Sequence, residues 1–143
     1  MLALVGPTGW DVGATLDAAS ARPDDVKLLG YVDDDELAEL YAGCSCFAYP
    51  SLYEGFGLPV LEAMSAGAPV ITSNVSSLPE VAGDSALMVD PLDVAAITAA
   101  LVEVLTNPAT AKRLGVAGRK RAATFSWDRT AQETLAVMRA ITR

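Results

Sequence analysis

Short hydrophobic runs alternate with longer segments of helical periodicity along the whole chain. The runs predict strands over residues 2–5, 26–29, 46–49, 70–71 and 87–89, and the first of these strands is expected to be buried. The segments between and after them predict helices over residues 11–21, 33–41, 58–66, 77–81, 93–105, 109–124 and from 127 onward. This alternation, with short loops, is typical of a parallel sheet covered by helices on both faces. We therefore predict a single Rossmann-like α/β domain over residues 1–143.

Polar residues and glycine mark the ends of several predicted helices. Asp33 fits the N-cap of one helix, and Ser126 fits the N-cap of the last helix. Gly67 fits a left-handed residue that ends the helix before it. The last helix should bury the side formed by Trp127, Ala131, Leu135 and Met138.

Residues 54–72 combine a glycine-bearing turn, a short helix and the start of the next strand. The helix is predicted to begin near Leu58 or Pro59, because proline has no N–H to lose at the first helical position. The loop and the helix N-terminus would bring main-chain N–H groups to one place. Such a place binds anions, and phosphates above all.

Two carboxylates flank this predicted anion site. Glu62 is expected in the first turn of the helix, where the helix dipole alone would stabilise a negative side chain. Glu54 precedes the helix and has no such structural reason. A carboxylate there would repel a phosphate, whereas it accepts hydrogen bonds well from neighbouring hydroxyls. Sugar hydroxyls are therefore the predicted partners of Glu54.

Composition excludes several classes of function. The net charge is −8, with 10 basic residues and no histidine, so no basic patch is available for nucleic acid. No hydrophobic run approaches the ~20 residues of a membrane span, and the N-terminal run is too short for a signal peptide. Cys44 and Cys46 are expected to be ordinary reduced thiols rather than metal ligands. These features favour a cytoplasmic protein.

The run Tyr-Glu-Gly-Phe-Gly-Leu-Pro-Val-Leu-Glu-Ala-Met at residues 53–64 resembles the donor-binding signature of a known family. The family is that of the retaining GT-B glycosyltransferases, family 4, also called glycosyl transferases group 1. The resemblance continues through residues 73–83, 89–91 and 125–127, so it covers nearly the whole chain. It implies the C-terminal, donor-binding domain of the GT-B fold.

The resemblance also implies roles for particular residues. Glu54, the catalytic candidate, should contact hydroxyls of the donor sugar, and Glu62 should bind the ribose hydroxyls. Main-chain N–H groups around the turn should reach the sugar and the diphosphate, and they belong to Gly55, Phe56, Gly57 and Leu58. Phe56 could instead be a hydrophobic lid on the turn.

The turn after the second strand is expected to meet the nucleotide base. Tyr31 and Val32 are the residues that the resemblance places there. A tyrosine that packs the rim of the sheet is an equally good interpretation of Tyr31. The earlier turn at residues 6–9 carries no dinucleotide fingerprint and is read as a plain turn.

The resemblance further implies a hexose donor, a nucleotide-diphospho-sugar such as GDP-mannose or UDP-glucose, and no metal. The family's basic phosphate clamp, its first strand in this domain and its N-terminal acceptor domain have no counterpart in the sequence, so we expect a truncated donor half that is inactive in isolation. The alternative is a non-catalytic sugar-nucleotide-binding or protein-interaction module. A nucleotide-sugar epimerase is a weaker alternative, because the Phe-Gly-Leu-Pro run argues against it.

The absent first strand also predicts self-association. In the strand order 3-2-1-4-5-6 that strand pairs with the second and the fourth, which here are residues 2–5 and 46–49. Strand edges without partners tend to pair with a second copy of the chain.

Overall fold

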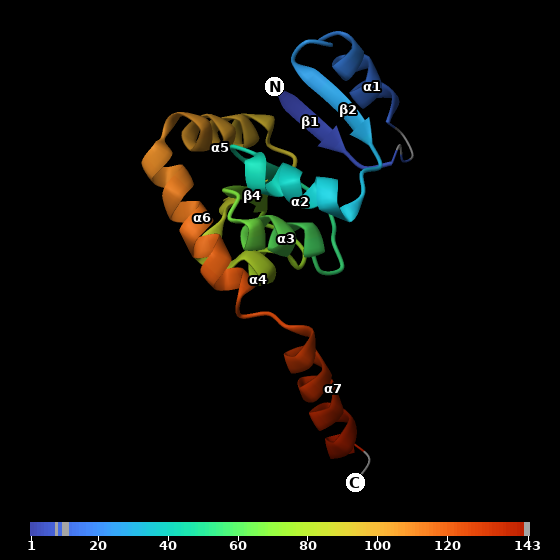
Figure 1. Cartoon of the computed structure of the whole chain (residues 1–143), viewed down its shortest axis with the longest axis vertical. Helices are drawn as coiled ribbons and strands as arrows, with labels where there is room; N and C mark the ends of the chain where they lie inside the picture. The colour runs from blue at the N-terminus through green and yellow to red at the C-terminus, as the bar shows by residue number, and fades with distance from the viewer. Residues whose placement is uncertain (8, 10–11, 142–143) are drawn as a thin grey trace. The chain divides into compact units, whose positions relative to one another are not determined.

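The computed structural model describes residues 1–7, 9 and 12–141. The chain divides into two compact units, Met1–Glu39 and Leu40–Arg143 (Figure 1). Both units contain a parallel sheet with helical connections, which confirms the predicted α/β class. That the two units form one domain stays a prediction.

The first unit is a β-α-β arrangement. Strand β1, Leu2–Val5, pairs in parallel with β2, Val26–Gly30, and helix α1, Gly13–Ser20, lies between them in sequence. Helix α2, Asp34–Gly43, begins in this unit, and Asp33 accepts a hydrogen bond from the N–H of Glu36 at 2.9 Å, as predicted for its N-cap. Of the predicted turn and first helix, Thr8 and Asp11 lie outside the described residues.

The prediction that residues 2–5 form a buried strand is right about the strand and wrong about its burial. Leu2 is 53% exposed and Val5 is 43% exposed. A two-stranded sheet with one neighbouring helix cannot cover both faces of its strands. Hydrophobicity indicates that β1 can be buried, but it does not say which element covers it.

The second unit holds a three-stranded parallel sheet in which β4 is central. Its four residues, Val70–Ser73, are all buried. The flanking strands are β3, Phe47–Tyr49, and β5, Leu87–Val89. The other elements are α3, Leu58–Ala66; α4, Leu78–Ala82; a short 3-10 turn, Gly83–Ser85; α5, Val94–Thr106; α6, Pro108–Ala122; and α7, Trp127–Ile141.

Helix α6 fixes the C-terminal ends of α3 and α4. Gly115 and Gly118 allow the close approach, because a Cβ at Gly118 would lie 3.1 Å from the side chain of Met64. Arg119 donates to the carbonyl oxygen of Ala66 at 2.8 Å, and Arg121 donates to that of Val81 at 2.9 Å. Both guanidinium groups thereby complement the negative ends of short helices.

Glycines determine where α3 begins and ends. Gly57 precedes the helix with a φ of 103°, and Gly67 follows it with a φ of 85°. Leu58 is the first helical residue and Pro59 the second, in agreement with the predicted start. The left-handed conformation at Gly67 is the predicted helix stop.

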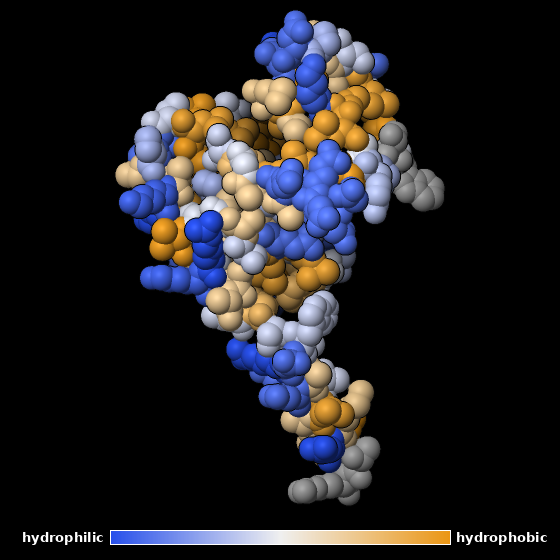
Figure 2. All heavy atoms as spheres, in the orientation of Figure 1, coloured by the Kyte–Doolittle hydropathy of each residue, from blue (hydrophilic) through white to orange (hydrophobic). Residues whose placement is uncertain are grey.

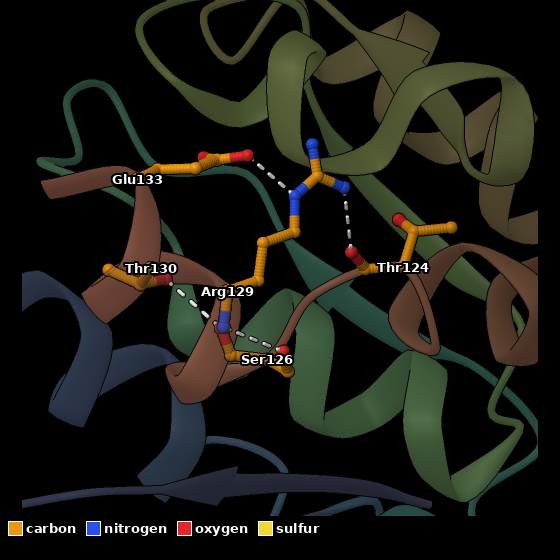
Figure 3. Close-up of polar contacts among 5 residues, drawn as sticks. All are labelled: Thr124, Ser126, Arg129, Thr130 and Glu133. Carbon is orange, nitrogen blue, oxygen red and sulfur yellow. Dashed lines mark hydrogen bonds and ion pairs between the residues drawn. The ribbon is translucent and has the colours of Figure 1, made fainter. Parts of the chain in front are cut away.

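Helix α7 begins as predicted. Ser126 Oγ accepts from the N–H of Arg129 at 3.2 Å, and the Arg129 side chain reaches Glu133 at 2.8 Å and the carbonyl oxygen of Thr124 at 3.4 Å (Figure 3). The bond to Ser126 satisfies one of the N–H groups that have no partner within the helix at its N-terminus.

The predicted inward side of α7 is wrong. Trp127 is 77% exposed, Leu135 50% and Met138 54%, and Ala131 is exposed as well. Figure 2 shows hydrophobic side chains on the visible face of this helix. The periodicity correctly identifies an apolar face, but burial requires a partner surface, and no described residue of α7 is buried.

None of the described helices is by itself long and apolar enough to cross a membrane. Helices α5 and α6 meet the length and composition test only when taken together, and the chain bends by 98° between them.

The turn at Gly57 gives a prediction with a matched control. A Cβ at Gly57 would lie 2.6 Å from the Leu78 side chain, and an L residue there would hold an unfavourable positive φ. Gly57→Ala should lower the free energy of unfolding by about 2–4 kcal/mol. Gly55→Ala should change it by less than about 1 kcal/mol, since Gly55 has no positive φ and has open space around it. Urea denaturation measures both, and equal losses would refute this account of the turn.

Candidate functional site

The candidate site lies at the carboxyl edge of the second sheet. The loop of residues 50–57 follows β3 and leads into α3, and residues 74–77 follow β4 and lead into α4. Because β3 and β4 are parallel neighbours, both loops emerge at the same edge. Ligands of open α/β sheets bind at this edge.

Hydroxyl groups from β4 and the loop after it hold the first loop in place. Ser73 Oγ donates to the carbonyl oxygen of Ser51, and Ser76 Oγ donates to that of Glu54 at 2.6 Å. Ser76 Oγ also accepts from the N–H of Glu54 at 3.1 Å. Ser77 Oγ donates to the carbonyl oxygen of Phe56 at 2.9 Å. The loop is therefore fixed through its main chain.

These hydrogen bonds determine which way the loop's N–H groups point. In a trans peptide the C=O and the following N–H point in opposite directions, and the described residues contain no cis peptide. Since the carbonyls of Glu54 and Phe56 face the serines, the N–H groups of Gly55 and Gly57 face away from them. Within the described part of the chain, the N–H groups of Gly55, Gly57 and Leu58 make no hydrogen bond. They are available to a ligand.

Ser76 adopts a left-handed conformation with a φ of 60°. Among the described residues it alone does so without being glycine. This conformation costs roughly 1–3 kcal/mol and concentrates at functional sites. Here it lets one hydroxyl hold both main-chain polar groups of Glu54.

Each carboxylate of the Glu-x7-Glu pair has a tyrosine partner. Tyr49 Oη donates to Glu54 Oε1 at 2.6 Å, and Tyr41 Oη donates to Glu62 Oε2 at 3.2 Å. The short distance in the first pair is typical of a hydrogen bond to a charged acceptor. The side chain of Glu54 is partly buried, and Glu62 is exposed.

The position of Glu62 corrects one expectation. The sequence predicts Glu62 in the first turn of the helix, but α3 begins at Leu58, so Glu62 is the fifth helical residue and the first turn holds no acidic residue. The helix dipole acts mainly within the first turn. A purely structural explanation of Glu62 is therefore weaker than the sequence indicated.

The two tyrosines belong to one aromatic layer. The Tyr41 ring meets Phe47 edge to face at 5.2 Å, and Phe47 stacks on Tyr49 at 5.8 Å between centroids. Burial, followed by the nearby Glu62 carboxylate, raises the pKa of Tyr41 far above its ordinary value. Burial, followed by the hydrogen bond to Glu54, also raises the pKa of Tyr49. Both phenols therefore remain donors at neutral pH.

A hollow of about 260 Å³ opens beside Glu62 and the start of α3. Its aromatic lining consists of Phe56, Phe125 and Trp127. The Phe56 ring meets Phe125 edge to face at 6.1 Å, and the Arg121 guanidinium lies 4.8 Å from the Phe125 ring centroid. Phe56 is thus packed on one side while it remains 43% exposed.

The other predicted site residues lie in the first unit. Tyr31 is 81% exposed and does not pack the rim of the sheet, whereas Val32 is buried, with 9% exposed. The structure thus brings Glu54, the turn after it and Glu62 together in one unit. Contact between Tyr31 or Val32 and a nucleotide base stays a prediction.

Burial raises the pKa of both cysteine thiols, to about 12 for Cys46. Neither cysteine forms a disulfide bond, and their interpretation as ordinary reduced thiols stays a prediction. Among the described residues, no group of three acidic, cysteine or histidine side chains could hold a metal ion.

Sequence reasoning missed the tyrosines and serines that support the site. Tyr41 and Glu62 are 21 residues apart, and Ser76 and Glu54 are 22 apart, so no local pattern joins them. Two signals were present nonetheless. A serine-rich segment follows the central strand, and Tyr49 ends the strand that leads into the motif.

An open parallel sheet connected by helices defines the second unit as Rossmann-like, and N–H groups and carboxylates gather at its carboxyl edge. The protein-family model described as "Glycosyl transferases group 1" matches residues 3–121 of the sequence. The chain belongs to this family, and the resemblance predicted from its motifs is confirmed.

Two relatives are mannosyltransferases. O-antigen chain mannosyltransferase B of Escherichia coli is 46% identical over 136 residues, which cover 94% of this chain and 36% of that protein. The MMP alpha-(1->4)-mannosyltransferase of Mycolicibacterium hassiacum is 46% identical over 110 residues, which cover 74% and 27%. The chain thus spans about a third of the length of these relatives.

Solved structures support the GT-B assignment. The structure of sucrose-phosphate synthase from Thermosynechococcus elongatus superposes with a TM-score of 0.84 and 32% sequence identity. The match covers 99% of this chain and 38% of the synthase chain. The match to HepE of Anabaena in complex with UDP-glucose covers 96% of this chain and 40% of the HepE chain, with a TM-score of 0.84. At 19% identity, the second likeness concerns the fold alone.

The raised pKa of Tyr41 predicts a pH dependence of stability. Its contribution is complete below the ordinary tyrosine value of about 10 and is lost as pH rises toward the folded-state pKa, because the unfolded chain releases its proton first. Between pH 9 and 11 the free energy of unfolding of the wild type should fall as the pH rises. In Tyr41→Phe it should fall less steeply, and the two slopes should differ by up to about 1.4 kcal/mol per pH unit. The raised pKa values of Cys44 and Cys46 also lower stability as pH rises, but they do so equally in the wild type and in Tyr41→Phe. Parallel curves of unfolding free energy against pH for these two proteins would contradict the prediction.

Proposed function

We propose that this chain is the donor-binding part of a retaining glycosyltransferase. Its ligand is a nucleotide-diphospho-sugar, and the transferred group is a hexose such as mannose or glucose. One observation supports the proposal above all. Two carboxylates, each hydrogen-bonded through one oxygen, flank a turn whose N–H groups point away from the protein's own acceptors.

In this proposal each group at the edge has a separate ligand partner. Glu54 accepts hydrogen bonds from the donor sugar, and Glu62 accepts them from the ribose. The N–H groups of Gly55, Phe56, Gly57 and Leu58 face the sugar and the diphosphate. Gly55 supports this arrangement, because neither its φ nor its neighbours require a glycine there. Close approach of a ligand would explain it.

The chemistry assigned to the chain is positioning and charge stabilisation. In retaining transfer the leaving diphosphate develops negative charge, which N–H groups and a helix N-terminus stabilise without reorganising. GDP-mannose and UDP-glucose are the donors we propose to test first, and no metal is invoked. A non-catalytic sugar-nucleotide-binding module is the alternative, and measured sugar transfer to an acceptor would exclude it. The inactivity of this chain in isolation and its cytoplasmic location stay predictions.

The division of roles predicts different losses for two variants. Glu62→Ala should weaken the binding of nucleoside diphosphate and of nucleotide sugar by about tenfold or more, since a charge-assisted hydrogen bond is worth roughly 1.5–3 kcal/mol. Glu54→Ala should weaken the nucleotide sugar similarly and leave the nucleoside diphosphate within about twofold. Calorimetric titration with GDP, UDP and their sugars measures this. A wild-type chain that binds no nucleotide sugar, or equal losses for both ligands in both variants, would refute the proposal.

Self-association is a second prediction. Within the described residues, β1 pairs only with β2, and β3 pairs only with β4, so each sheet has an edge strand. The apolar side chains of β1 are largely exposed, and such edges pair with further strands. We expect a dimer or larger species by light scattering after gel filtration. Lysine substitution at Leu2 and Leu4 should shift it toward monomer, and a folded monomer at high concentration would rule the idea out.

A further inference from the structure

We propose that Tyr49 and Tyr41 are positioning residues, each of which sets the orientation of one donor-site carboxylate. The inference rests on the proposed function. It assigns to two residues outside the Glu-x7-Glu motif the task of fixing Glu54 and Glu62 before a ligand arrives.

The hydrogen bonds leave one oxygen of each carboxylate for the ligand. Tyr49 occupies Oε1 of Glu54, and Tyr41 occupies Oε2 of Glu62. A carboxylate offers about four acceptor positions on two oxygens, so a single phenol does not exhaust it. The second oxygen stays able to accept from a pair of sugar hydroxyls.

The tyrosine rings are held firmly enough to orient their partners. Tyr41 is 8% exposed, and Phe47 contacts both tyrosine rings. Thr72 Oγ1 also donates to the carbonyl oxygen of Tyr49 at 3.1 Å, which ties this residue to the central strand. A glutamate on a flexible side chain loses freedom on binding, and a fixed phenol removes part of that loss beforehand.

The two pairs differ in strength. The Tyr49–Glu54 distance of 2.6 Å is short, whereas the Tyr41–Glu62 distance of 3.2 Å is long for a hydroxyl donor. Tyr49 should therefore constrain the sugar end of the site more tightly than Tyr41 constrains the ribose end.

Phenylalanine variants test the proposal, because they remove the hydroxyl and keep the ring. For Tyr49→Phe we expect about tenfold weaker binding of GDP-mannose or UDP-glucose, whichever binds the wild-type chain, and unchanged binding of the free nucleoside diphosphate within about twofold. For Tyr41→Phe we expect about threefold weaker binding of both, and a smaller preference for the nucleoside diphosphate over its 2′-deoxy analogue. A loss of packing alone would change neither the affinity ratio of nucleotide sugar to nucleoside diphosphate nor that of nucleoside diphosphate to its 2′-deoxy analogue.

Tyr53→Phe is the matched control. Tyr53 lies in the loop of residues 50–57, next to Glu54, and its variant also loses a phenol hydroxyl, but Tyr53 is 81% exposed and has no carboxylate partner among the described residues. Its ligand ratios should equal those of the wild type. Wild-type ratios in both Tyr49→Phe and Tyr41→Phe, with ligands bound, would overturn the inference and leave the proposed function intact.

A measurement without ligand distinguishes failure of the proposed function from failure of the inference about the two tyrosines. In the ligand-free full chain, Tyr49→Phe should shift the carboxyl ¹³C resonance of Glu54 and leave that of Glu62, and Tyr41→Phe should do the reverse. If the wild-type chain binds no nucleotide sugar, the proposed function fails while these resonances still decide the pairing. Unshifted resonances in both variants would overturn the inference on their own.

Discussion

The fixed orientation of the peptides between Glu54 and Gly57 is the constraint on which the site depends. Serine hydroxyls hold the carbonyl oxygens of Glu54 and Phe56, and the opposite N–H groups are thereby turned outward. The serines follow β4, the most buried strand of the second unit, so the loop takes its geometry from the core. The rigidity of the central strand thus extends to the outward-turned N–H groups of the loop.

Much of this arrangement follows from residue types with strict backbone preferences. Gly57, Pro59 and Gly67 determine the start and end of α3, and these positions were predicted because a left-handed turn or a missing N–H permits few alternatives. The N-caps at Asp33 and Ser126 were predictable for a similar reason, since a short polar side chain before a helix satisfies a free N–H.

Contacts between distant residues could not be predicted in this way. Tyr41 reaches Glu62 from another helix, and Ser76 reaches Glu54 from beyond the next strand. Burial failed for a different reason, as β1 and α7 show. Their sequences specify an apolar face, but the partner for that face need not be encoded in the same stretch of chain.

Electrostatics indicates what kind of recognition this edge can achieve. The chain carries a net charge of −8, and two of its carboxylates lie at the site, so the overall field disfavours a diphosphate. Arg119 and Arg121 are bonded to main-chain oxygens at helix ends. The N–H groups of the turn and the N-terminus of α3 offer local compensation. A phosphate alone therefore gains little here, whereas sugar hydroxyls bring donors that the carboxylates can accept. If the ligand is the proposed nucleotide sugar, selection at this edge depends on hydroxyl groups more than on charge, and hydroxyl groups are what distinguish a nucleotide sugar from other phosphates in a cell.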